Sequence, residues 1–114
     1  MCDFEIKGRD NTVLVKPEQI VRVEHVSRTM QFYMSDGSIY TSIYIRQPFE
    51  AELEPLLSDG HFIQPHKSFI INMDYVSEVT PREFVMTDGA VIPISRNNGE
   101  VKKQYLEYLT RAGR

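Results

Sequence analysis

Residues 62–72 read FIQPHKSFIIN, and the surrounding chain is best interpreted outward from this stretch. An apolar segment at 62–64 and an apolar run at 69–71 enclose three polar side chains, those of His66, Lys67 and Ser68. Short segments rich in aromatic and β-branched residues are typical of strands. The stretch therefore predicts a strand that enters a polar loop, with a second apolar segment directly after it.

Similar segments recur roughly every eight to twelve residues along most of the chain, which indicates a mainly β domain. The pairs Asp36-Gly37 and Asp88-Gly89 separate such segments, and both residue types tolerate positive φ. Each pair is therefore predicted to close a two-residue hairpin. The other predicted strands lie at 4–8, 12–16, 20–25, 30–34, 38–42, 76–80, 84–86 and 91–94.

Two segments follow a helical period instead. Pro48 suits the first turn of a helix that would end before Gly60, and Pro55 is expected to divide this helix into two turns. Near the end of the chain, Asn97 and Glu100 have the spacing of a capping box, which predicts a helix that starts right after Arg96. The apolar residues at helical spacing are Phe49, Leu53, Leu56 and Leu57 in the first segment, and Val101, Tyr105, Leu106 and Leu109 in the second.

Length and composition set the broad class of protein. A chain of 114 residues with 41% hydrophobic residues fits one globular domain spanning residues 1–114. The single cysteine, Cys2, cannot form an internal disulfide, so we expect a reducing compartment, the cytoplasm. No apolar run is long enough for a signal peptide or a membrane span, so we expect no contact with a membrane.

Charge is distributed unevenly along the chain. The net charge of −3 argues against an anionic partner, but residues 50–59 hold four acidic residues and no basic one. From Ser95 onward, five basic residues face two acidic ones. This basic end is either a cationic binding surface or a solvated helix face followed by a tail.

Catalytic and metal-binding patterns are absent from the sequence. His66, Ser68 and Asp74 lie near one another, but no Gly-x-Ser-x-Gly elbow accompanies them. The three histidines lack metal-ligand spacing, and the glycines are scattered singly rather than gathered in a phosphate-binding loop. We therefore expect no enzymatic activity, no cofactor and no metal.

The remaining chemistry is polar and basic and lies in two loops. Residues 66–68 offer an imidazole, an ammonium and a hydroxyl group, and residues 95–98 read Ser-Arg-Asn-Asn at the predicted helix N-terminus. Such groups can bind a phosphate or the edge of a base, and free N–H groups at a helix start favour phosphate. The alternative for both loops is ordinary loop polarity and helix capping.

At this point the sequence resembles a known family, the LytTR (LytR/AlgR-type) DNA-binding domains. Their central signature reads Phe, a basic or polar residue, and His-[Arg/Lys]-Ser-aromatic-aliphatic-aliphatic-Asn, as in residues 62–72. A strand ending in Ser-Arg follows about thirty residues later, as at Ser95 and Arg96. Residues 13–15 resemble the family's opening strand, residues 17–20 the turn after it, and residues 49–57 its internal helix.

The resemblance implies an elongated stack of antiparallel β-sheets with one short internal helix and a C-terminal helix. Family members insert loops, rather than a recognition helix, into successive major grooves. Arg96 and Lys67 match base-contacting positions, and Lys67 directly follows the signature His66. A third contact region falls at Arg28, Thr29 and Met30. The positions that tend to hold phosphates are matched by Ser68, Ser95, Asn97 and Lys102.

Two residues depart from the family pattern. Gln64 stands where many members carry arginine, and Pro65 stands where an aliphatic residue or cysteine is usual. We therefore expect DNA affinity or loop geometry to differ from that of typical members. We also expect the acidic segment 50–59 to lie on the face away from the duplex.

The resemblance implies a sequence-specific DNA-binding domain of a bacterial transcription regulator, either a response-regulator output domain or a stand-alone protein. It implies binding to direct repeats in double-stranded DNA, with dimerisation through a receiver domain in longer relatives. By itself this chain is expected to be a monomer or a weak dimer. The alternative is a protein-interaction or signalling module that kept the fold and lost DNA binding.

Overall fold

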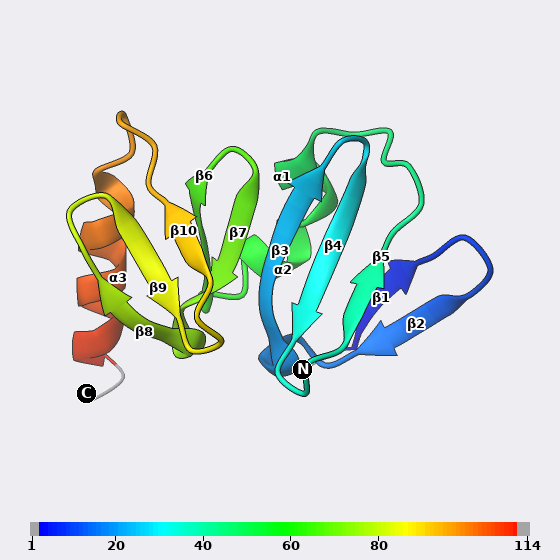
Figure 1. The fold of residues 1–114 in the computed structure, drawn as a ribbon, viewed down its shortest axis with the longest axis horizontal. Coiled ribbons are helices and arrows are strands. Elements are labelled where there is room, and N and C mark those ends of the chain that lie inside the picture. The colour runs from blue at the N-terminus through cyan, green and yellow to red at the C-terminus, as the bar shows by residue number, and fades with distance from the viewer. Residues whose placement is uncertain (1–2, 112–114) are drawn as a thin grey trace.

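Three antiparallel sheets follow one another along the long axis of the molecule, whose extents are 40 × 28 × 25 Å (Figure 1). The structure is a computed structural model that describes residues 3–111. Strands account for 40% of these residues and helices for 24%, so the predicted mainly β architecture is confirmed. No helix within residues 3–111 is both long enough and apolar enough to cross a membrane.

The strands lie within about two residues of their predicted positions. The first sheet pairs β1 (Phe4–Lys7) with β2 (Thr12–Val15). The central sheet has the order β5 (Ile39–Thr41), β4 (Thr29–Met34), β3 (Ile20–Val26), β7 (Phe69–Asn72) and β6 (Phe62–His66). The third sheet has the order β10 (Val91–Pro93), β9 (Glu83–Met86) and β8 (Val76–Val79). Short 3₁₀ turns at Pro17–Gln19 and Met73–Tyr75 lead into β3 and β8.

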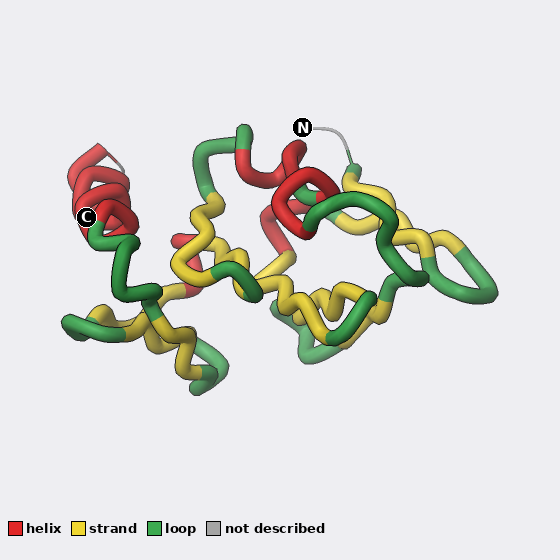
Figure 2. Tube along the Cα trace, turned by 90° about the horizontal axis from the view of Figure 1, so that it is seen from above, coloured by secondary structure: helices red, strands yellow, loops and turns green. Residues whose placement is uncertain are grey.

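Two short helices, α1 (Phe49–Glu52) and α2 (Glu54–Leu57), cover one face of the central sheet (Figure 2). They meet at Leu53, and Pro55 lies in the first turn of α2. This confirms the predicted division, because proline lacks the N–H that a continuous helix would use. Their apolar side chains complete a core with the inward residues of the sheet: Phe49, Leu53 and Leu56 pack with Ile20, Val23, Phe32 and Ile70.

A second core joins the third sheet, the C-terminal helix α3 (Glu100–Arg111) and residues of the central sheet such as Ile63 and Ile71. The ring of Tyr105 meets that of Phe84 edge to face, with 5.6 Å between ring centres. The predicted start of this helix was wrong, because α3 begins at Glu100 rather than right after Arg96. The Asn97 capping box does not form, since residues 95–98 make a turn closed by the Asn98 N–H and the Ser95 carbonyl at 3.0 Å.

The two Asp-Gly turns also differ from the prediction in length. Each closes a hairpin, but the loops contain three residues, 35–37 and 87–89. Within these two loops only the glycines have positive φ, 90° at Gly37 and 89° at Gly89. In each loop the glycine N–H closes the turn by donating to the carbonyl three residues earlier, and the chain then reverses through the glycine. The two-residue hairpins occur elsewhere, at residues 27–28 between β3 and β4 and at residues 67–68 between β6 and β7.

Candidate nucleic-acid interface

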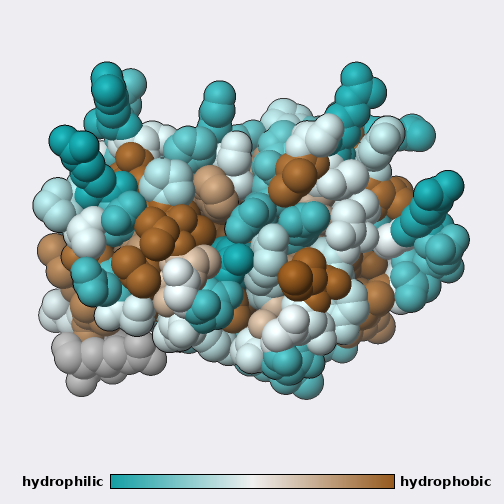
Figure 3. Space-filling view, in the orientation of Figure 1, coloured by the Kyte–Doolittle hydropathy of each residue, from teal (hydrophilic) through white to brown (hydrophobic). Residues whose placement is uncertain are grey.

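Three loops that are distant in sequence lie along one long edge of the molecule, the upper edge in Figure 1. They are the β3–β4 hairpin at residues 27–28, the β6–β7 hairpin at residues 67–68, and the β10–α3 connection at residues 94–99. We call this the loop edge. Hydrophilic side chains project from it at several points along its length (Figure 3).

The β3–β4 hairpin places Arg28 at its tip, where the side chain is exposed. Ser27 adopts φ of 56° to make this tight turn, and the Thr29 hydroxyl donates to the Val26 carbonyl at 2.9 Å. Met30 points the other way, because its side chain is only 7% exposed and belongs to the core under the helix pair. Arg28 and Thr29 therefore remain candidates for contact, and Met30 does not.

The β6–β7 hairpin presents Lys67 to solvent between two supporting contacts. Nδ1 of His66 accepts a hydrogen bond from the Ser68 N–H at 3.1 Å, and the His66 ring stands edge-on against Phe69 at 5.5 Å. The Ser68 carbonyl accepts from the His25 N–H of β3 at 2.8 Å, which ties the hairpin to the sheet. His66 thus uses one ring nitrogen to hold the turn, and Lys67 is the side chain that the turn displays.

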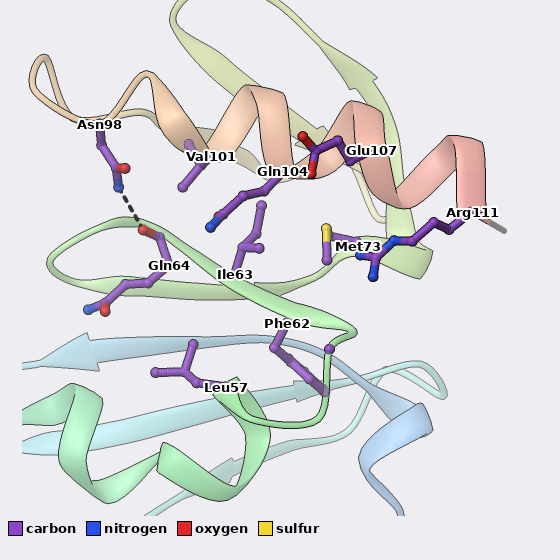
Figure 4. A pocket seen from close by; sticks show the side chains of 11 residues that line it. Leu57, Phe62, Ile63, Gln64, Met73, Asn98, Val101, Gln104, Glu107 and Arg111 are labelled. Carbon is purple, nitrogen blue, oxygen red and sulfur yellow. Dashed lines mark hydrogen bonds between the residues drawn. The ribbon is translucent and has the colours of Figure 1, made fainter.

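The third loop presents Arg96 and Asn97, both exposed, at the centre of the turn formed by residues 95–98. The Ser95 N–H donates to the Pro65 carbonyl at 2.9 Å, and the Asn98 side-chain amide donates to the Gln64 carbonyl at 2.8 Å (Figure 4). Because α3 starts at Glu100, this turn precedes the helix instead of forming its N-terminus. The prediction that residues 95–98 form the helix N-terminus is therefore wrong, so they do not offer free helix N–H groups. Lys102 lies beyond the turn, half-buried in the first turns of α3.

Two further exposed arginines lie beside this edge, and the sequence interpretation missed both. The Ile45 N–H donates to the Arg28 carbonyl at 2.8 Å, which brings Arg46 next to the first hairpin. The Ile94 N–H donates to the Arg82 carbonyl at 2.8 Å, which brings Arg82 next to the third loop. Each is a single arginine in its loop, so no local sequence pattern identified it as a candidate binding residue.

Acidic side chains lie both away from the loop edge and beside it. The hairpin turns with Asp36 and Asp88 point to the opposite edge (Figure 1). Exposed Glu50 belongs to α1, which lies beside the loop edge (Figure 1), and its carboxylate accepts from the Gln64 side-chain amide at 3.5 Å. The exposed cations Arg28, Lys67 and Arg96 therefore share this edge with Glu50, in a chain whose net charge is −3. Cations gathered on exposed loops can attract a polyanion even where the average charge is acidic.

An ion pair between buried Arg22 and exposed Asp88 joins the central sheet to the third sheet. Arg22 of β3 is 8% exposed; its Nε donates to Glu24 at 2.9 Å and its Nη1 donates to Asp88. Partial burial would by itself raise the pKa of Asp88, but hydrogen bonds from the Ala90 N–H and Arg22, and the charge of Arg22, outweigh it and lower that pKa. The pair therefore stays charged and fixes the two sheets that carry the loops.

Known proteins have sequences similar to that of this chain. The family model described as "LytTr DNA-binding domain" matches residues 10–107. The "Sensory transduction protein LytT" of Enterococcus faecalis is 30% identical over 97 residues, covering 81% of this chain and 38% of that protein. The protein of the same name in Bacillus subtilis is 36% identical over 59 residues, 47% of this chain and 24% of that protein. The chain spans about two fifths of the length of the first of these relatives.

A solved structure has the same fold. It is the "LytTr DNA-binding domain of putative methyl-accepting/DNA response regulator from Bacillus cereus", which matches with a TM-score of 0.73 over 93% of this chain and 97% of that one. Its sequence identity of 21% means that the likeness concerns the fold. The elongated arrangement of sheets is therefore shared with a domain from a chain of nearly equal extent.

Proposed function

The chain belongs to the LytTR family of DNA-binding domains, and from this premise we propose that it is the sequence-specific DNA-binding domain of a bacterial transcription regulator. Its three loops insert into successive major grooves of double-stranded DNA. The observation that carries the proposal is the placement of Arg28, Lys67 and Arg96, each exposed on a hydrogen-bonded turn, along one edge of the molecule.

Base recognition is assigned to the tips of the three loops. The planar guanidinium of Arg96 can donate to guanine O6 and N7 together, and Lys67 can donate to the same acceptors as a single cation. Arg28 and Thr29 form the third contact region. Support for these assignments comes from the hydrogen bonds that hold each turn, because bidentate contacts need a fixed backbone.

Phosphate contacts position the domain along the duplex. Ser68 and Ser95 flank the two base-reading cations, and Asn97 shares the exposed turn with Arg96. Lys102 follows in the first turns of α3. Arg46 and Arg82, which border the first and third loops, add two cations to this set. His66 supports the turn that carries Lys67.

We also propose how the domain acts within a longer protein. Residues 1–114 act as one domain in the cytoplasm, and they contact DNA without catalysis, a cofactor or a metal. A receiver domain in the full-length protein brings two copies together on direct repeats, and the isolated chain is a monomer or a weak dimer. The match to only part of the LytT proteins supports the idea of a further domain.

The test is a selection of bound duplexes from a random pool, followed by anisotropy titrations of the selected and a random duplex. We expect a preferred site, and a slope of log K against log salt of roughly −4 to −5 if about four to six phosphates are neutralised. Failure to bind any duplex at about 50 mM salt, where phosphate contacts are strong, would overturn the proposal. That result would favour a protein-interaction module on the same fold.

A further inference from the structure

The turn that presents Arg96 is attached to β6 at both of its ends. At its start, the Ser95 N–H donates to the Pro65 carbonyl at 2.9 Å. At its end, the Asn98 side-chain amide donates to the Gln64 carbonyl at 2.8 Å (Figure 4). The Asn98 backbone N–H also closes the turn onto the Ser95 carbonyl at 3.0 Å. Asn98 thus supplies two of the three hydrogen bonds that hold the turn.

A local irregularity in β6 presents these two carbonyls to the turn. The register between β6 and β7 shifts between Ile63 and His66, so Gln64 and Pro65 lie outside the regular pairing. Proline has no N–H to leave unpaired at such a position, and Pro65 is almost completely buried. Two successive carbonyls of an edge strand are therefore free to accept hydrogen bonds from the 95–98 turn.

The same strand leads directly into the hairpin that displays Lys67. Pro65 is two residues before Lys67, so the anchors of the Arg96 turn and the base of the Lys67 hairpin belong to one short piece of backbone. The distance between these two cations is consequently set by the contacts of Ser95 and Asn98 with β6. The Ser95 contact is made by the backbone and does not use the Ser95 side chain, whereas the Asn98 contact depends on its side chain.

We infer that Asn98 is a positioning residue for base recognition, which fixes the Arg96 turn relative to the Lys67 hairpin through its bond to the Gln64 carbonyl. The inference rests on the proposed function. Without this bond the end of the turn is released, and the Arg96 guanidinium must be ordered when DNA binds. This cost applies to the preferred site, where Arg96 makes a directional contact, and not to random DNA, which is bound through phosphates.

The experiment is a double-mutant cycle on the full chain with the selected and the random duplex. Asn98→Ala should weaken binding to the selected duplex by roughly 3- to 10-fold, as expected for one hydrogen bond, and should leave random binding unchanged. In an Arg96→Ala background, the same change at position 98 should have an effect below about twofold, because the contact that it supports is already gone. Asn98→Asp keeps the size of the side chain but sets a carboxylate against the carbonyl, so it should behave like Asn98→Ala or worse.

Gln104→Ala is the matched control, since Gln104 is an exposed amide of α3 lining the same pocket (Figure 4). It should bind both duplexes like the unmodified chain. Equal losses on both duplexes with a lower unfolding temperature would overturn the inference, because they indicate a merely structural role for Asn98. Full discrimination by the Asn98→Ala protein would overturn it while leaving the proposed function intact. A chain without any preferred duplex would overturn the proposed function itself, and the inference with it.

Discussion

The guanidinium of Arg22 is paired with Asp88, which lies at the tip of a hairpin in the neighbouring sheet. The same guanidinium lies 3.8 Å from the centre of the Tyr33 ring, on the adjacent strand of its own sheet. One buried cation therefore spans the boundary between the sheet that carries Arg28 and Lys67 and the sheet that leads to Arg96. Removing a partner from such a pair leaves a buried charge without full compensation.

The first prediction concerns the pH dependence of this pair. The pKa of Asp88 is lowered in the folded chain, so its contribution to stability is present above the ordinary carboxyl pKa of about 4 and is lost as the pH falls through the lower, folded value. Asp88→Asn should cost about 1 kcal/mol at pH 7, a thermal midpoint roughly 4 °C lower. The difference between the two proteins should be smaller at pH 2 than at pH 7.

Thermal unfolding by circular dichroism at both pH values measures this difference. Glu78→Gln, which changes an exposed carboxylate on β8, serves as the control and should leave the midpoint nearly unchanged at pH 7. An equal loss for Asp88→Asn at pH 7 and at pH 2 would mean that the carboxylate charge is not what stabilises the boundary.

A second prediction separates base reading from structure at Arg96. Arg96→Lys keeps the charge but loses the planar fork, so it should cost about 1 to 3 kcal/mol on the preferred duplex and little on random DNA. Arg96→Ala should lose at least as much specific affinity. The thermal midpoint should move by only a few degrees for either variant, because Arg96 is exposed. A stable Arg96→Ala protein with undiminished preference would remove the base-reading assignment.

The third prediction tests a phosphate contact. Lys102→Ala should weaken binding to all sequences alike and should reduce the steepness of the salt dependence by roughly 1. Lys103→Ala, a change at the exposed neighbour in α3, is the matched control. If Lys102→Ala leaves the salt slope unchanged, Lys102 is only a solvated residue of the helix.

The fourth prediction concerns the first hairpin, where two neighbouring candidates have opposite environments. Met30→Ala should destabilise the fold by about 2 to 4 kcal/mol, because it leaves a cavity in the core under the helix pair. Arg28→Ala should leave stability within about 0.5 kcal/mol and should weaken DNA binding. Denaturant unfolding and anisotropy titration of both proteins check the two halves. If the Met30→Ala protein is stable but discriminates less between the preferred and the random duplex, Met30 is a contact residue after all.

Much of the fold and part of the site could be predicted from the sequence, because they depend on local preferences. Alternating apolar residues place the strands within about two residues, and Pro55 divides the internal helix where proline chemistry requires it. The exposed positions of Lys67 and Arg96 in loops also follow from the polar stretches around them. Each of these features depends on neighbours in the chain, which a single sequence displays.

Other features were decided only by the tertiary structure, because they depend on contacts between residues far apart in the sequence. Asn98 bonds to the Gln64 carbonyl, and α3 starts at Glu100 instead of at the local capping signal of Asn97. Backbone bonds across loops bring Arg46 and Arg82 to the loop edge. These contacts are made with backbone groups, which every residue type carries. The residue types therefore do not predict these contacts. Only the folded structure shows which backbone carbonyl accepts from which donor.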